Sequence, residues 1–217
     1  MRSALAYRAN LLLALVAGSG LLLRLVLTIV HPDSAPDNPE LLTRLVRFFS
    51  YFTIQSNIAV LVAALAVLRL RDLHTPGQRA LRLAALVGIS VTGIVYVTIL
   101  AGDSAHNGVL SELANALLHY VCPPLAVLVW LGLGPWPGLS LGDLGRMMVW
   151  PVAWIVYTLI RGAIVDWYPY GFIDADLHSY GEVAVNVGAI VVFAIGLGAA
   201  YATLDRWRAR NAGSAAR

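Results

Sequence analysis

The stretch that decides the fold is RFFSYFTIQSN, residues 47–57, which opens an apolar run that continues as IAVLVAALAVLRL. This stretch contains hydroxyl and amide side chains, namely Ser50, Thr53, Gln55, Ser56 and Asn57. Hydrocarbon offers such groups no hydrogen-bond partner, so burying them alone is costly. Their place at the start of a membrane-grade segment predicts that they line a functional site inside a membrane.

The composition of the chain is that of a membrane protein. Hydrophobic residues make up 59% of the 217 residues and charged residues only 12%, whereas soluble domains are about half apolar and about a quarter charged. All 15 basic residues are arginine, which indicates a GC-rich and hence bacterial genome. The single Cys122 excludes an internal disulfide.

Several segments contain the roughly 20 apolar residues that a helix needs to cross a bilayer. They are residues 9–30, 48–68, 80–101, 109–132, 147–165 and 183–204. The first is too long for a cleaved signal peptide and contains Arg24, so we expect it to be retained. We predict an all-α integral membrane bundle of six helices in one domain, residues 1–205, followed by a basic tail, residues 206–217.

The arginines predict how this bundle is oriented. Most of them flank the segment ends that six crossings place on one side, together with both termini. The opposite loops are rich in aspartate and glutamate, and Arg44 and Arg47 are the basic exception there. By the positive-inside rule both termini are cytoplasmic, and we expect the bacterial plasma membrane. The net charge of +3 follows from this topology and indicates no nucleic-acid partner.

Polar side chains recur at helical spacing within the segments. Ser50, Thr53 and Asn57 share one face of the second segment, and Asn115 and His119 share one face of the fourth. These stripes lie in the outer half of the predicted membrane, whereas the inner halves are nearly pure hydrocarbon. Because polar groups inside a membrane usually face a cavity, we predict a cavity that opens toward the outer side.

Each of these residues also has a purely structural interpretation. Thr53 could bond its own helix, and Asn57 and Asn115 could join neighbouring helices. Arg161 could extend to the membrane surface, and Arg24 could pair with an acid or bind a lipid head group. A histidine inside a membrane protein can likewise be a hydrogen-bonded core residue.

The second and fourth segments together resemble the androgen-induced-protein-like family of six-helix membrane proteins, which includes hydrolases of fatty-acid esters of hydroxy fatty acids. The patches are FTIQSNIAV with Thr53, LHYVCPPL with His119 and Pro124, and DWYPYGF before the last segment. The extended run TIQSN is similar to the bacterial branch of that family. The resemblance implies a threonine nucleophile at Thr53 and a histidine partner at His119, in a hydrolase of lipid esters.

A threonine hydroxyl needs a base to accept its proton as it attacks a carbonyl, and neutral imidazole is the usual base near pH 7. We therefore expect Thr53 to attack an ester carbonyl and His119 to accept the proton, without a cofactor. The expected oxyanion donors are Gln55, Asn57 and Asn115. Arg161 or Arg24 would hold a substrate carboxylate. The substrate would come from the membrane lipids.

Two other functions remain open from the residues alone. A metal site is disfavoured, because zinc needs three or four close ligands and the spacing of Glu112 and His119 does not supply a tight pair. The loop histidines His31, His106 and His178 could join acidic residues there. A non-catalytic protein that binds or transports a lipid or a small carboxylate would use the same polar stripes.

Overall fold

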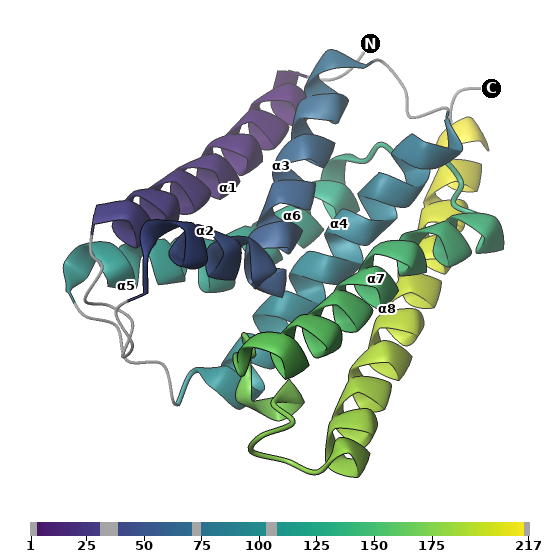
Figure 1. Ribbon diagram of the computed structural model, residues 1–217. Helices are drawn as coiled ribbons and strands as arrows, with labels where there is room; N and C mark the ends of the chain where they lie inside the picture. The colour runs from purple at the N-terminus through teal and green to yellow at the C-terminus, as the bar shows by residue number, and fades with distance from the viewer. Residues whose placement is uncertain (1–3, 31–38, 71–74, 103–107, 215–217) are drawn as a thin grey trace.

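The computed structural model describes residues 4–30, 39–70, 75–102 and 108–214 of the chain. Within these residues all regular secondary structure is helical, and six helical segments are long and apolar enough to cross a membrane. This confirms the predicted all-α bundle with six candidate spans. The first turn of α1 and the last turn of α8 lie at the same end of the bundle (Figure 1), which we call the terminal end; the opposite one is the distal end.

The spanning helices overlap the predicted segments but differ from several of them at their ends. Their bounds are α1, Ala4–Val30; α2, Leu41–Ser50; α3, Phe52–Arg69; α4, Pro76–Val95; η2, Tyr96–Leu100; α5, Val109–Asn115; η3, Ala116–Val121; α6, Cys122–Leu133; α7, Leu141–Val165; η4, Gly171–Ile173; and α8, Tyr180–Ser214. The short elements η2 and η3 are π-helical turns that continue α4 and join α5 to α6, and η4 is a 3₁₀ turn. The third span is therefore one continuous helical run that ends in a wider turn, and the fourth is one with a wider turn inside it.

The second predicted segment, residues 48–68, differs from the structure at its start. Residues 48–50 belong to the separate helix α2, and Tyr51 is extended, with φ −68° and ψ 126°. The spanning helix α3 begins only at Phe52. Neither proline nor glycine marks this break, so the sequence pattern did not predict it.

The last predicted segment, residues 183–204, also differs from the structure. Helix α8 continues through the first part of the predicted tail as far as Ser214. Arginine and alanine are good helix formers, and they extend the helix past its apolar part. Residue 206 is therefore no boundary in the backbone.

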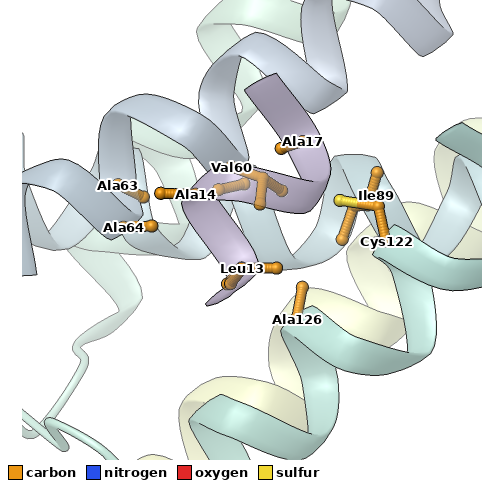
Figure 2. Close-up of a cluster of buried hydrophobic side chains, with 10 residues drawn as sticks. Leu13, Ala14, Ala17, Val60, Ala63, Ala64, Ile89, Cys122 and Ala126 are labelled. Carbon is orange, nitrogen blue, oxygen red and sulfur yellow. The ribbon is translucent and has the colours of Figure 1, made fainter. Parts of the chain in front are cut away.

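Helix α4 lies at the centre of the bundle and packs against α3, α6, α7 and α8. One core cluster joins α1, α3, α4 and α6 through small side chains such as Ala17, Ala64 and Ala126 (Figure 2). Small residues let helix backbones approach closely, which is the usual way that helices associate inside membranes. The close packing fixes α3 against the fourth span.

Polar side chains are also buried at the terminal end, close to or just beyond the ends of the predicted segments. They are Asn10, Arg82, Asp143 and Asp205. Asp143 forms an ion pair with Arg79 at 3.1 Å, and Asp205 accepts backbone N–H groups from the connection between α6 and α7. Arg79 and Arg82 are among the arginines that predict the orientation of the bundle. They also tie α4 to α7 and to the connection before it, through Asp143 and the carbonyl of Gly134.

The close contact between Gly162 of α7 and Tyr168 fixes the segment that follows α7. A Cβ atom at position 162 would lie 2.0 Å from the Tyr168 ring. We predict that Gly162→Ala lowers the free energy of unfolding by about 1–3 kcal/mol, the usual cost of overpacking.

The matched control is Gly145→Ala in the same helix, where a Cβ atom meets nothing within 4 Å. That change should be neutral or stabilising, by up to about 1 kcal/mol. Thermal or chaotrope unfolding in detergent measures both. An equal loss in the two variants would contradict the assigned contact.

Candidate active site

Thr53 lies in the first turn of α3, with its side chain buried at 7% exposure. In an uninterrupted helix its N–H would bond the carbonyl of Phe49. Because α3 starts at Phe52, that N–H instead donates to the hydroxyl of Tyr170 at 3.2 Å. The Phe49 carbonyl accepts from the Gln55 side chain at 2.9 Å. The helix break therefore leaves the Thr53 N–H without a helical acceptor, and Tyr170 accepts it beside the Thr53 hydroxyl.

His119 lies in η3 and reaches Thr53 across the interface between α3 and the fourth span. The distance from His119 Nε2 to Thr53 Oγ1 is 3.2 Å, and His119 Nδ1 lies 3.2 Å from the backbone carbonyl of Asn115. A carbonyl only accepts, so in the neutral ring Nδ1 carries the proton. Nε2 then presents its lone pair to the threonine hydroxyl. This is the tautomer that a general base requires.

Two π-helical turns hold the imidazole in place. His119 is in η3, and Tyr96, which begins η2, stacks on its ring with centroids 4.0 Å apart. Asn115 Nδ2 donates to the Tyr96 hydroxyl at 2.7 Å. Single π turns inside α-helices occur frequently at functional sites. Here Tyr96 packs on the face of the imidazole, while Thr53 and the Asn115 carbonyl bond its two nitrogens.

Asn57 joins the two elements that carry the pair. Its Nδ2 group donates to the carbonyl of Thr53 at 2.9 Å and to that of Leu118 at 3.3 Å. In the π-helical pattern Leu118 would bond the N–H of residue 123, which is a proline and has none. Asn57 therefore satisfies the carbonyl that Pro123 leaves without a donor, one helical turn from Thr53.

Tyr170 is the site residue that sequence reasoning missed. Its hydroxyl lies 3.4 Å from Thr53 Oγ1 as well as near the Thr53 N–H. The ring packs edge-on against Tyr51 and stacks on Phe172. Burial raises the pKa of Tyr170 to about 12, so at neutral pH the phenol is protonated and can donate. The DWYPYGF patch drew attention to this segment, but nothing in it distinguished Tyr170 from Tyr168.

A large apolar cavity adjoins this group. It has an empty volume of about 750 Å³, counting its open side, and lies among α3, α4, α7, α8 and the η4 segment. Thr53 and Tyr170 form part of its wall, together with Thr92, and nearly all other lining residues are apolar, such as Val91 and Ile190. Cavities with such an apolar lining usually hold apolar molecules. The threonine hydroxyl therefore lies at the edge of a space that suits an acyl chain.

The other predicted site residues take different roles in this geometry. The Gln55 side chain is held by Phe49 and by the indole N–H of Trp150. The N–H groups of Asn57 and the Nδ2 group of Asn115 bond elsewhere, as described. Arg161 lies over the ring of Trp167, and Arg24 is an exposed residue of α1. Thr53 and His119 are thus brought together, while none of the three amides points to the threonine hydroxyl.

The described residues contain no candidate metal site. Within the described ranges no three His, Cys, Asp or Glu side chains lie close enough to hold a metal ion. His31 and His106, which the sequence analysis considered, lie outside those ranges. His178 accordingly belongs to no such group among the described side chains.

No protein-family model, no curated protein and no solved structure matches this chain.

Proposed function

We propose that the protein is a threonine-dependent hydrolase that cleaves an ester of a lipid inside the membrane. The proposal rests on the 3.2 Å contact between Thr53 Oγ1 and His119 Nε2, which lies within the range for a nucleophile and its base. The apolar cavity beside Thr53 supports a lipid substrate. The resemblance of the patches around Thr53 and His119 to a family of lipid-ester hydrolases agrees with it.

In the proposed mechanism Thr53 Oγ1 attacks the ester carbonyl carbon while its proton passes to His119 Nε2. The tetrahedral intermediate then collapses, the bond to the alcohol oxygen breaks, and the leaving alcohol takes the proton from His119. Water attacks the acyl-threonine in the same way, giving a proton to His119 and releasing the acid. Thr53 recovers its proton as its bond to the acyl carbon breaks.

The negative charge on the carbonyl oxygen needs hydrogen-bond donors during both steps. The first N–H groups of a helix have no partner within it, and the helix dipole favours an anion there. Thr53 is in that first turn. Its N–H donates to the Tyr170 hydroxyl in the structure. We assign this N–H and the protonated hydroxyl of Tyr170 to the oxyanion as its two donors, with the N–H turning from the phenol oxygen to the oxyanion when substrate binds. They replace the three amide side chains that the sequence suggested.

The predicted topology completes the proposal. With both termini in the cytoplasm, the distal end, which carries the segment between α7 and α8, faces the outer side. The lipid would come sideways from the bilayer into the apolar cavity, and water would come from the outer face. A bacterial plasma membrane is the proposed location.

A covalent probe tests the nucleophile. We predict that an alkyl fluorophosphonate labels the purified protein, that Thr53→Ala abolishes labelling because no oxygen remains to attack, and that His119→Ala slows labelling at least 100-fold. The control is Thr92→Ala, because Thr92 lines the same cavity and its buried hydroxyl has no hydrogen-bond partner among the described residues. Intact-protein mass spectrometry measures the label.

The control should label at the normal rate. Labelling that persists in a folded Thr53→Ala protein would exclude Thr53 as the nucleophile. A non-catalytic lipid-binding protein, which the apolar cavity would also suit, would take up no label in any variant.

A second test concerns Tyr170. We predict that Tyr170→Phe lowers kcat about 100-fold with little change in KM, because the lost donor acts in the transition state. Since the pKa of Tyr170 is raised to about 12, deprotonation of this phenol should cause no fall in activity near pH 10. Ester turnover from pH 7 to 11 measures both effects.

The control for this substitution is Tyr157→Phe. It removes a hydroxyl that hydrogen-bonds Ser50, the last residue of α2. Turnover in that variant should stay within a few-fold of normal. An unchanged kcat in Tyr170→Phe would remove Tyr170 from the mechanism.

A further inference from the structure

Three residues at the base contact one another in a closed triangle. His119 Nδ1 bonds the Asn115 carbonyl, Asn115 Nδ2 donates to the Tyr96 hydroxyl, and the Tyr96 ring stacks back on the imidazole. His119 and Asn115 belong to the fourth span, and Tyr96 belongs to the third. The imidazole is therefore held from two spans by contacts that do not involve Thr53.

The stack between Tyr96 and His119 is close and nearly parallel. The ring centroids are 4.0 Å apart and the ring planes meet at 26°. Tyr96 is buried, and the ring of Tyr120 packs edge-on against it at 5.4 Å. The torsion that turns a histidine ring about its Cβ–Cγ bond has broad energy wells. A buried ring on the imidazole face therefore limits a rotation that would swing Nε2 away from Thr53.

A glycine allows α4 to come this close to the fourth span. Gly93 lies three residues before Tyr96, and a Cβ atom there would be 2.8 Å from the Pro123 side chain and 3.6 Å from the backbone carbonyl of His119. The backbone of α4 thus touches the turn that carries the base. At Tyr96 itself α4 gives way to the π-helical turn η2. The stack therefore rests on a close approach of two backbones.

The stack also acts on the charge that the proposed reaction creates. When His119 accepts the proton of Thr53, the imidazole becomes a cation. The face of an aromatic ring attracts a cation that lies within about 6 Å of its centroid, most strongly where water is excluded. Tyr96 therefore stabilises the state after proton transfer more than the resting enzyme. An interaction that is stronger in the transition state raises kcat.

We propose that Tyr96 is a positioning residue of the base, and that Asn115 anchors its hydroxyl. The Tyr96 ring keeps the imidazole aimed at Thr53 and stabilises the imidazolium that forms. The inference rests on the proposed function for the reaction itself. It also gives Asn115 a role other than that of an oxyanion donor, since its carbonyl orients His119 and its amide holds Tyr96.

Substitutions at Tyr96 separate the effect of the ring from that of its hydroxyl. Tyr96→Leu removes the aromatic face, so we expect kcat to fall about 30-fold. KM should change less than about twofold, because the described cavity lining does not include Tyr96. Tyr96→Phe keeps the face and loses only the bond to Asn115, so its kcat should stay within about fivefold of normal. Ester turnover over a range of substrate concentrations measures both constants.

A spectroscopic measurement tests the stack without any turnover. A proton on the imidazole resonates upfield when an aromatic ring lies over the imidazole face. In protein with ¹³C-labelled histidine, the ring signal of His119, assigned by its absence in His119→Gln, should move downfield in Tyr96→Leu and stay close to its place in Tyr96→Phe. The control is Tyr7→Leu, which removes an exposed tyrosine of α1 and should change neither kcat nor this signal.

The outcomes separate this inference from the proposed function. Unchanged kcat in a folded Tyr96→Leu protein, or an equal loss in Tyr96→Phe, would overturn the role of the ring. An unmoved His119 signal in Tyr96→Leu would overturn the stack. Absence of ester turnover in the wild-type protein would contradict the proposed function instead. If Tyr96→Leu fails to fold, Tyr96→Met takes its place, since methionine is flexible enough to fill the gap and has no aromatic face.

Discussion

The structure depends on how the broken backbone between α2 and α3 is satisfied. Inside a bilayer every N–H and C=O group needs a partner within the protein. At this break three side chains supply it: Gln55 bonds the carbonyl of Phe49, Trp154 bonds that of Ser50, and Tyr170 accepts the N–H of Thr53. Of the polar side chains of RFFSYFTIQSN, Gln55 therefore helps a new helix to begin at Phe52, and the other two partners come from the segments around Trp154 and Tyr170. The position of Thr53 beside His119 depends on the same break, since a helix that starts at Phe52 places Thr53 in its first turn.

Most of the architecture could be predicted from hydrophobic segment length. Six apolar runs separated by turn residues become six helical spans, because length and composition determine what can cross a bilayer. The break at Tyr51 could not be predicted, since its cause lies in distant partners: Trp154 and Tyr170 follow it by about a hundred residues. The buried charges at the terminal end were missed for a similar reason. Asp143 and Asp205 are close to segment ends in the sequence, where carboxylates are normally exposed, and only the packing of α4 against α7 and α8 buries them.

The candidate site, too, could be predicted only in part from the sequence. Helical spacing put Thr53 and Asn57 on one face and Asn115 and His119 on another, and the structure turns these faces toward each other. Periodicity cannot tell which amide N–H groups are already engaged, so Gln55, Asn57 and Asn115 were all named as donors. It also cannot find Tyr170, whose position depends on a short irregular segment after α7. That segment is fixed by the close approach of Tyr168 to Gly162. No local sequence pattern predicts this contact.

The two ends of the bundle are held together by different forces. At the terminal end Arg79 pairs with Asp143, Arg82 donates to the carbonyl of Gly134 at 2.7 Å, and Asp205 accepts two backbone amides. These bonds require fixed geometry, and a small separation breaks them. At the distal end the rings of Tyr51, Trp154, Trp167 and Tyr170 contact one another, and such contacts can slide without being lost. The buried ion pair and its hydrogen bonds therefore hold the terminal end, whereas packed aromatic rings hold the distal end together with the hydrogen bonds around Thr53.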